Sequence, residues 1–296
     1  MKERDEKNQT LEVDTEEKWL RKKCKAAKSQ VKDTIDYLKN NSLHFRNNTG
    51  KTVALDSKVE VLPIVVFKND KIKNYDHLLK KHTEDGLDVN CLSFEDYAVM
   101  CEKLISPVEI VDYLKWRQKF YVENGSISMM ISETDDGVAV FNPQHRESLI
   151  SEYLKYQYGD MNYYFDNDLS QIFNAYVYNL SNHTVIQSED DAAYEIIKVL
   201  AHFHIDEIKA FVERTTLALE LAKKKEYKLI VGNMRNTLKH MVTVFEAPER
   251  GTCIPSEILL DICKKNTPMS IDELLQVVCY WESELDYRID FVYFRK

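Results

Sequence analysis

Close cysteine pairs and long apolar runs are both missing from the chain. None of the six cysteines forms a CxxC pair, the arrangement on which zinc ribbons and fingers depend. No stretch approaches the roughly 18 apolar residues of a membrane helix, and residues 1–7 are charged, unlike the start of a signal peptide. We therefore expect six reduced thiols, several of them buried, in a cytoplasmic protein that does not contact a membrane.

Glycine and proline are scarce, and positive charge is outweighed by negative charge. Seven Gly and six Pro favour long regular elements over a loop-rich sandwich. The formal net charge of −9 argues against a protein coated in nucleic acid, although a local basic patch remains compatible with binding it. The 296 residues are about twice the usual size of one domain, so we expect two domains.

The first elements have the pattern of a helix followed by a strand. Apolar residues recur at helical spacing over residues 18–40, and this segment carries no acid between Lys18 and Lys32. Residues 59–67 are strand-like. The continuous apolar run over residues 64–67 predicts a strand that is covered on both faces, as in a sheet flanked by helices.

Two capped helices are predicted next. Residues 89–92 form a second short apolar run, and Ser93 then has the position of an N-cap. The following helix has a clearer start, because Ser106 can cap it, Pro107 suits its first turn, and Glu109 stands three residues after the serine.

The part of the chain after Gly125 is predicted to mix hairpin, helix and strand. Asp136-Gly137 is a strong hairpin signal, and residues 145–180 are helical or rich in aromatic residues. A long helical segment opens at Ser188 and is predicted to break near residues 204–206.

The C-terminal segments complete the expected fold. Repeating apolar residues predict a helix over residues 226–245, and a capping box at residues 270–273 predicts another over residues 274–281. Residues 287–294 are strand-like. The fold class that we expect is an α/β N-terminal part with a flanked sheet, followed by an α+β or mainly helical C-terminal domain.

Complete catalytic motifs are absent from the sequence. There is no P-loop, GxGxxG, GxSxG, HExxH or EF-hand loop. His202 and His204 are two residues apart, so on a helix they point to different faces and do not readily share a metal ion. Catalytic and metal-ligating residues therefore stay unassigned.

A run of basic residues in the first helix is the candidate binding site. Several lysines in a row raise the local affinity for phosphate in a salt-dependent way. The alternative is a solvated helix face, as most charge runs are. The candidate nucleic-acid-binding residues are Arg21, Lys22, Lys25, Lys28 and Lys32.

Three segments together resemble a known family. Residues 17–32 begin EKWLRKK, residues 61–67 read VLPIVVF, and residues 92–97 read LSFEDY, with SPVEIVDYL following at residues 106–114. Their order resembles bacterial restriction-endonuclease-like proteins of the PD-(D/E)xK superfamily, near the NERD-type nucleases. The resemblance covers residues 14–120 and consists of a pattern of elements rather than a diagnostic motif.

The resemblance implies that the catalytic strands are missing or incomplete. In that family, acidic residues that hold a divalent cation, and a lysine beside the attacking water, come before the basic helix. Here Lys2 would be the tail of the catalytic strand, and residues 12–14 the only acidic, strand-like remnant. Either the chain starts late or it is a natural relative that lost catalysis. Residues 1–124 would be an incomplete nuclease-like α/β domain, and residues 125–296 a mainly helical α+β domain.

The function that the resemblance implies is that of a nucleic-acid-associated, restriction-endonuclease-like protein, inactive as this chain stands. If it is active, we expect a metal-dependent DNA endonuclease that uses Mg²⁺; otherwise we expect no cofactor in this chain. The alternative is a non-enzymatic protein-interaction module that uses the helical C-terminal half, and an enzyme with a dispersed active site ranks third. The partners to consider are therefore DNA, another protein and a second copy of the chain.

Overall fold

Two compact units make up the chain. The first comprises Met1–Lys103 and Ile110–Tyr164, and the second comprises Leu104–Glu109 and Phe165–Lys296. Both combine helices and strands, so the mixed α and β class is confirmed, and the boundary that we expected after residue 124 falls within the first unit. The computed structural model describes residues 2–3, 13–41, 44–46, 52–54, 61–69, 89–124, 130–134, 137–141, 146–159, 167–182, 192–233, 241–248, 253–266, 271, 273–283 and 286–295.

A parallel sheet lies at the centre of the first unit. Strand β4 (Ile64–Lys68) lies between β1 (Lys2–Glu3) and β5 (Asn90–Ser93), and both neighbours run parallel to it. The strand predicted over residues 64–67 is therefore confirmed, but the full burial predicted for both of its faces is not, because Ile64 and Val66 are half-buried. Burial alternates along β4, with Val65 and Phe67 fully covered and the residues between them half-buried.

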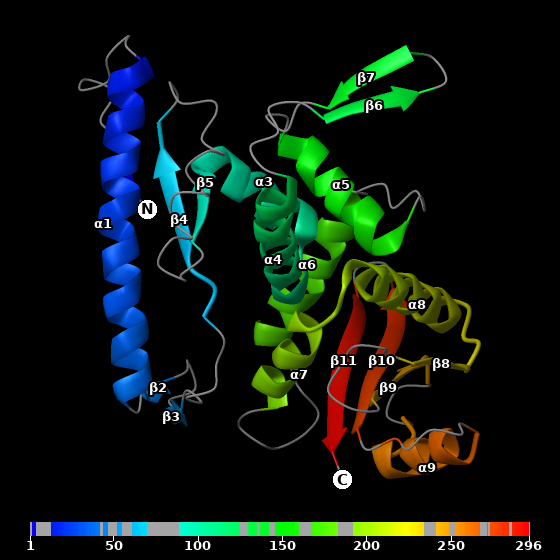
Figure 1. Cartoon of the computed structure of the whole chain (residues 1–296). Helices are drawn as coiled ribbons and strands as arrows, with labels where there is room; N and C mark the ends of the chain where they lie inside the picture. The colour runs from blue at the N-terminus through cyan, green and yellow to red at the C-terminus, as the bar shows by residue number, and fades with distance from the viewer. Residues whose placement is uncertain are drawn as a thin grey trace. The chain divides into compact units, whose positions relative to one another are not determined.

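Helix α1 (Val13–Asn40) packs against β4 (Figure 1). It is 28 residues long, and its described side chains are buried along one stripe only. Val13 and Asp14 belong to this helix, so the strand-like interpretation of residues 12–14 is wrong for those two residues, while Glu12 lies outside the described residues. Helical spacing of the apolar positions, which starts a few residues later, fixes which side of the helix faces the sheet.

The predicted cap serines are both confirmed. The backbone N–H of Asp96 donates to Ser93 Oγ over 3.0 Å, and that of Glu109 donates to Ser106 Oγ over 3.3 Å. These serines start the helices α3 (Phe94–Leu104) and α4 (Pro107–Asn124).

Among its described residues, the first unit also contains two antiparallel strand pairs and one further helix. The hairpin predicted at Asp136-Gly137 is present as β6 and β7, which pair antiparallel. Tyr153 is buried, and its ring centroid lies 5.4 Å from that of Tyr113 and 5.6 Å from that of Trp116, so it belongs to the core of this unit. The bounds are β2 (His44–Arg46), β3 (Thr52–Ala54), β6 (Met130–Thr134), β7 (Gly137–Phe141) and α5 (Arg146–Tyr158).

A four-stranded sheet organises the second unit, in the order β11-β10-β9-β8. Strand β10 pairs antiparallel with β11 and parallel with β9, and β9 pairs antiparallel with β8. The bounds are β8 (Leu229–Asn233), β9 (Met241–Glu246), β10 (Glu273–Ser283) and β11 (Asp286–Arg295). The last of these confirms the strand predicted over residues 287–294.

Two of the predicted helices are wrong. Residues 226–245 contain β8 and most of β9, and residues 274–281 lie in β10. The first seven residues of β10 are all buried, because the sheet is covered on both faces. Apolar residues then occupy successive positions, and such a run lacks the alternation that distinguishes a strand from a helix.

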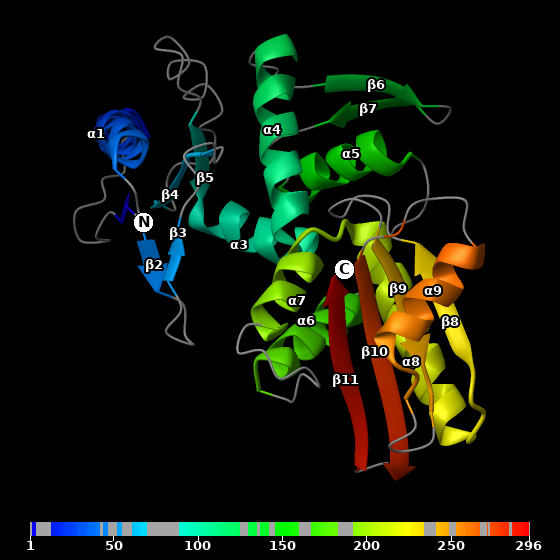
Figure 2. The same cartoon turned by 90° about the horizontal axis from the view of Figure 1, so that it is seen from below.

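Helices cover the two faces of this sheet separately (Figures 1 and 2). Leu275, Val277 and Cys279 of β10 pack with the cluster formed by α6, α7 and α8, whereas Leu274 packs with α9. The predicted break near residues 204–206 is confirmed, because α7 ends and α8 begins there. The bounds are α6 (Asn167–Asn182), α7 (Ala192–Ala201), α8 (Ile205–Lys223) and α9 (Ser256–Asn266). Within the described segments, no helix is long and apolar enough to cross a membrane.

Phe211 of α8 is the central aromatic residue of the second unit, and its truncation should be costly. Its ring centroid lies 5.7 Å from that of Phe203 and 5.5 Å from that of Phe245. We expect Phe211→Ala to lower the free energy of unfolding by about 3–5 kcal/mol, because it leaves a cavity among these rings. Leu217→Ala on the same helix is the control. Leu217 is 50% exposed, so its truncation should change stability by less than about 0.5 kcal/mol in the same urea titration.

Candidate nucleic-acid interface

Helix α1 carries its candidate binding residues outside its buried stripe, with Lys28 at the edge of the stripe, one turn after Cys24. Leu20, Cys24 and Ala27 are buried, whereas four of the five basic candidates are exposed and Lys28 is half-buried. These five residues form a surface that is called the basic face below. From Arg21 to Lys32 it extends roughly 16 Å along the helix axis. It comprises Arg21, Lys22, Lys25, Lys28 and Lys32.

Buried polar contact holds the first turn of α1 at the end of β4. Glu16 is fully buried, and its Oε2 accepts a hydrogen bond from Asn69 Nδ2 over 2.7 Å. A hydrogen bond to a buried carboxylate is stronger than one between neutral groups. Together with the apolar stripe, this bond fixes the rotation of the helix, so the four exposed residues of the basic face are directed toward the solvent.

Acidic residues of the same helix lie at both ends of the basic face, with Glu17 before Arg21 and with Asp33 and Asp36 after Lys32. Arg21 forms one ion pair, with Glu17 one turn earlier, at 3.4 Å. Exposed pairs of this kind contribute little to stability, because water screens both groups. An incoming phosphate could therefore replace Glu17 as the partner of Arg21 without a large loss of folding free energy.

Two cysteines meet beneath the basic face. Cys24 of α1 and Cys91 of β5 place their Sγ atoms 3.5 Å apart, and both side chains are buried. The hydrogen bond with Cys24, assisted by the positive charge of Arg117, lowers the pKa of Cys91 even though burial opposes this effect. The pKa of Cys24 is raised, first by the same hydrogen bond and then by burial. The guanidinium of Arg117, which lies beside Cys91, favours the thiolate on this residue.

A buried arginine connects α4 to β5. Arg117 Nη1 donates to Asn90 Oδ1 over 3.4 Å, and Nη2 donates to the carbonyl oxygen of Cys91 over 3.3 Å. The amide nitrogen Nδ2 of Asn90 is buried and has no hydrogen-bond partner. Arg117 thus contributes to the position and the electrostatics of the thiol pair. In the sequence it has the appearance of one more charged residue on a helix surface.

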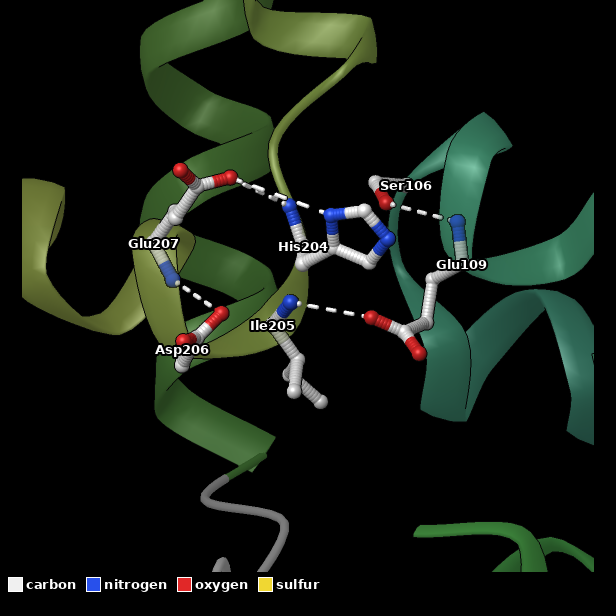
Figure 3. A network of polar contacts seen from close by, with 6 residues as sticks. All are labelled: Ser106, Glu109, His204, Ile205, Asp206 and Glu207. Atoms are coloured by element: carbon white, nitrogen blue, oxygen red, sulfur yellow. Dashed lines mark hydrogen bonds and ion pairs between the residues drawn. The ribbon is translucent and has the colours of Figure 1, made fainter. Parts of the chain in front are cut away.

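A network in the second unit joins the start of α4 to the start of α8 (Figure 3). Glu109 is fully buried, and its Oε2 accepts a hydrogen bond from the backbone N–H of Ile205 over 3.0 Å. Glu207 Oε2 accepts from the backbone N–H of His204 over 3.1 Å, and Asp206 Oδ1 accepts from that of Glu207 over 2.9 Å. Carboxylates thereby satisfy three amides at the N-terminal end of α8, where the helix dipole favours negative charge.

This network corrects the role that the sequence implied for Glu109. A capping box would return its side chain to the N–H of Ser106, yet its carboxylate binds an amide that lies 96 positions along the chain. His204 lies in this network, whereas His202 is exposed, with Nδ1 2.7 Å from the carbonyl oxygen of Lys198. Both histidines therefore have local structural contacts.

A second polar network attaches α9 to its sheet. Gln276 Nε2 donates to Glu246 Oε2 over 2.7 Å and to the carbonyl oxygen of Ile254 over 3.0 Å, while Ser256 Oγ donates to Gln276 Oε1 over 2.8 Å. Burial raises the pKa of Glu246, although its hydrogen bonds from Ile254 and Gln276 oppose this shift. The acceptors and donors are satisfied within the network, which gives it a structural role.

Comparison with protein-family models, with curated proteins and with solved structures gives no match to the chain. Among the described residues, no three His, Cys, Asp or Glu side chains gather in a group that could hold a metal ion. The basic face is thus the surface whose chemistry points most directly to a ligand. The sequence analysis did not predict the thiol pair or the hydrogen bonds of Glu16 and Arg117, because each depends on contacts between segments that are distant in the sequence.

Removal of the Glu109 carboxylate should expose the first amide of α8 to exchange. We expect Glu109→Ala to lower the free energy of unfolding by about 1–3 kcal/mol, because the buried N–H of Ile205 loses its acceptor. Glu109→Gln keeps an acceptor oxygen and should retain part of that stability. Hydrogen exchange at the Ile205 amide measures the effect directly. Unchanged exchange in Glu109→Ala would contradict this role, and Glu220→Ala, at an exposed position of α8, is the control.

Proposed function

We propose that this chain is a nucleic-acid-associated protein of the restriction-endonuclease-like kind, and that the basic face of α1 contacts the phosphates of duplex DNA. The observation that carries the proposal is the exposure of four basic side chains on one helix, with the half-buried Lys28 beside them at the edge of the buried stripe. Lysine and arginine side chains neutralise backbone phosphates and release condensed counterions, which supplies affinity without base recognition. The basic face is local, because the whole chain is acidic.

The arrangement of the first unit supports the nuclease-like part of the proposal. The basic helix packs on a strand that is the middle member of a parallel sheet, and the capped helices α3 and α4 follow the next strand. This is the order of elements on which the resemblance rests. Lys2 pairs with Phe67 across β1 and β4, as expected for the tail of a strand that precedes the helix. The finer arrangement that we propose is a nuclease-like α/β first part followed by an α+β second part.

We assign binding rather than cleavage to the described residues. A nuclease of this superfamily would need acidic groups to hold Mg²⁺, and the described residues bring no such group together. The side chains of Lys2 and Glu3 are outside the described residues, and so is Glu12. We therefore assign no catalytic step to this chain. Cleavage of DNA in the presence of Mg²⁺ is to be measured separately from binding.

A protein-interaction role for the second unit is the second candidate. Ile258 and Ile262 lie one turn apart on α9 and are 51% and 40% exposed, and Leu217 of α8 is also exposed. Exposed apolar residues that cluster on a helix are typical of contact surfaces. Measurement of the molecular mass in solution, with a pull-down from the source cell, tests this role. A monomer that retains no partner would count against it.

Charge reversal on the basic face should abolish binding to duplex DNA. We expect wild-type binding to weaken with salt, with a slope of log K against log salt of roughly −3 to −5, as about four or five phosphate contacts would give. The variant Lys22→Glu/Lys25→Glu/Lys32→Glu should bind about 100-fold or more weakly at low salt, because three contacts become repulsive. Fluorescence anisotropy with a labelled duplex measures both quantities.

A matched control separates the basic face from net charge. Lys224→Glu/Lys264→Glu/Lys265→Glu changes the total charge by the same amount at sites on or next to α8 and α9. It should bind DNA almost as the wild type does. Equal loss in both triple variants, or no wild-type binding at low salt, would remove the nucleic-acid function. Circular dichroism of each variant shows whether the fold is intact.

A further inference from the structure

We propose that Cys24 and Cys91 form a redox site at which a hydroperoxide joins α1 to β5 through a disulfide bond. Their Sγ atoms are 3.5 Å apart, although the two residues are separated by 67 positions in the sequence. In the described part of the chain, which includes all six cysteines, no second pair of thiols shows such a contact. Cys24 and Cys91 thus differ from the other four cysteines, whose sulfur atoms contact no second thiol within the described residues.

The electrostatics of the pair assign different roles to the two sulfur atoms. Arg117 lies on the Cys91 side of the pair, since its Nη2 donates to the carbonyl oxygen of Cys91 over 3.3 Å. This positive charge, together with the hydrogen bond to Cys24, lowers the pKa of Cys91. A thiolate, rather than a thiol, attacks a peroxide. Cys91 is therefore the residue that is oxidised first, and Cys24 is the resolving residue, since it is already in contact with the sulfur that it must attack.

The reaction balances with hydrogen peroxide as the oxidant. The Cys91 thiolate attacks one peroxide oxygen, the O–O bond breaks, and sulfenic acid and hydroxide form. The hydroxide takes the proton of the Cys24 thiol and becomes water. The Cys24 thiolate then attacks the sulfenic sulfur, the S–O bond breaks, and hydroxide leaves and is protonated. Two thiols and one peroxide thus give one disulfide and two waters, and both sulfur atoms are oxidised while the peroxide is reduced.

The packing of α1 allows the sulfur atoms to approach and the oxidant to enter. A disulfide requires the two sulfurs to move from their present contact to about 2.05 Å, which small side-chain rotations can supply. Cys24 is 1% exposed and Cys91 is 0% exposed, so peroxide must enter through local opening. Among the described residues of α1, none after Ala27 is buried, so the C-terminal half of the helix is its weakly held part.

The disulfide leaves the basic face unmodified. Cys24 lies on the buried stripe of α1, whereas four of the five basic residues are exposed and Lys28 is at the edge of the stripe. Oxidation therefore fastens the helix to the sheet without consuming a DNA-binding side chain. The redox site is independent of nucleic-acid binding, because it depends only on the contact between α1 and β5.

Peptide mapping of the peroxide-treated full chain tests the site. The folded protein is exposed to hydrogen peroxide, its remaining thiols are alkylated in denaturant, and it is digested without reductant. We expect a cross-linked peptide that contains Cys24 and Cys91, a mass loss of two hydrogen atoms, and a higher Tm that returns to the starting value with dithiothreitol. Recovery of both cysteines as alkylated free thiols, while the exposed Cys101 is oxidised, would overturn the proposal. Cross-links of Cys24 to several cysteines with equal frequency would also overturn it.

Single substitutions test the order of the two steps. In Cys24→Ser, sulfenic acid should accumulate on Cys91 and react with dimedone, whereas in Cys91→Ser the Cys24 thiol should stay largely unmodified. Equal labelling of the two variants would refute the assigned roles. Cys263→Ser, at a buried single cysteine, should leave the cross-link unchanged. If the serine variants do not fold, the mapping of the wild-type protein decides the proposal by itself.

Discussion

The burial of α1 on one side only is the constraint on which the proposed binding surface depends. An isolated helix of mixed charge is only marginally stable in water, and contact with the sheet supplies the missing stabilisation. The contact uses a narrow apolar stripe, and the buried bond between Glu16 and Asn69 prevents the helix from turning about its axis. Since the stripe faces inward, the lysines on the far side face the solvent. The same packing therefore determines the location of positive charge on an acidic protein.

Buried polar groups determine how neighbouring helices and strands are positioned within each unit. In the first unit, Arg117 links α4 to β5, and in the second unit Glu109 satisfies the first amide of α8. Apolar contacts alone would permit these elements to slide, because dispersion and the hydrophobic effect have little directionality. Hydrogen bonds to charged groups are directional, and loss of one partner leaves the other unsatisfied at considerable cost. These hydrogen bonds give each contact between elements one preferred geometry.

The sequence was informative wherever structure is determined by neighbouring residues. The caps at Ser93 and Ser106, the hairpin at Asp136-Gly137 and the strand at residues 64–67 are local patterns, and the structure contains all of them. Residues 274–281 misled the prediction, because a strand that is covered on both faces has no alternation to reveal it. The helix predicted over residues 226–245 was wrong for a related reason, because the spacing of the apolar residues there is also compatible with two short strands.

The candidate surface was predictable only in part, for the same physical reason. A run of lysines can be read from the sequence, and the apolar spacing of the helix indicates which side they occupy. The contact of Cys24 with Cys91 and the acceptor for Ile205 depend on chain segments that are 67 and 96 residues apart. No local pattern encodes such contacts. In the sequence, each of these residues therefore looks like an ordinary core residue or helix-cap residue.

Helix α4 has a consequence for dissection of the chain into fragments. Its first three residues, Pro107–Glu109, belong to the second unit, and the remainder, from Ile110, belongs to the first. The chain thus enters the second unit briefly, returns to the first, and enters the second again after Tyr164. A fragment that begins at Phe165 would lack the carboxylate that binds the amide of Ile205. No single break in the polypeptide yields two complete halves, so truncated versions would each carry a defect that the intact chain does not have.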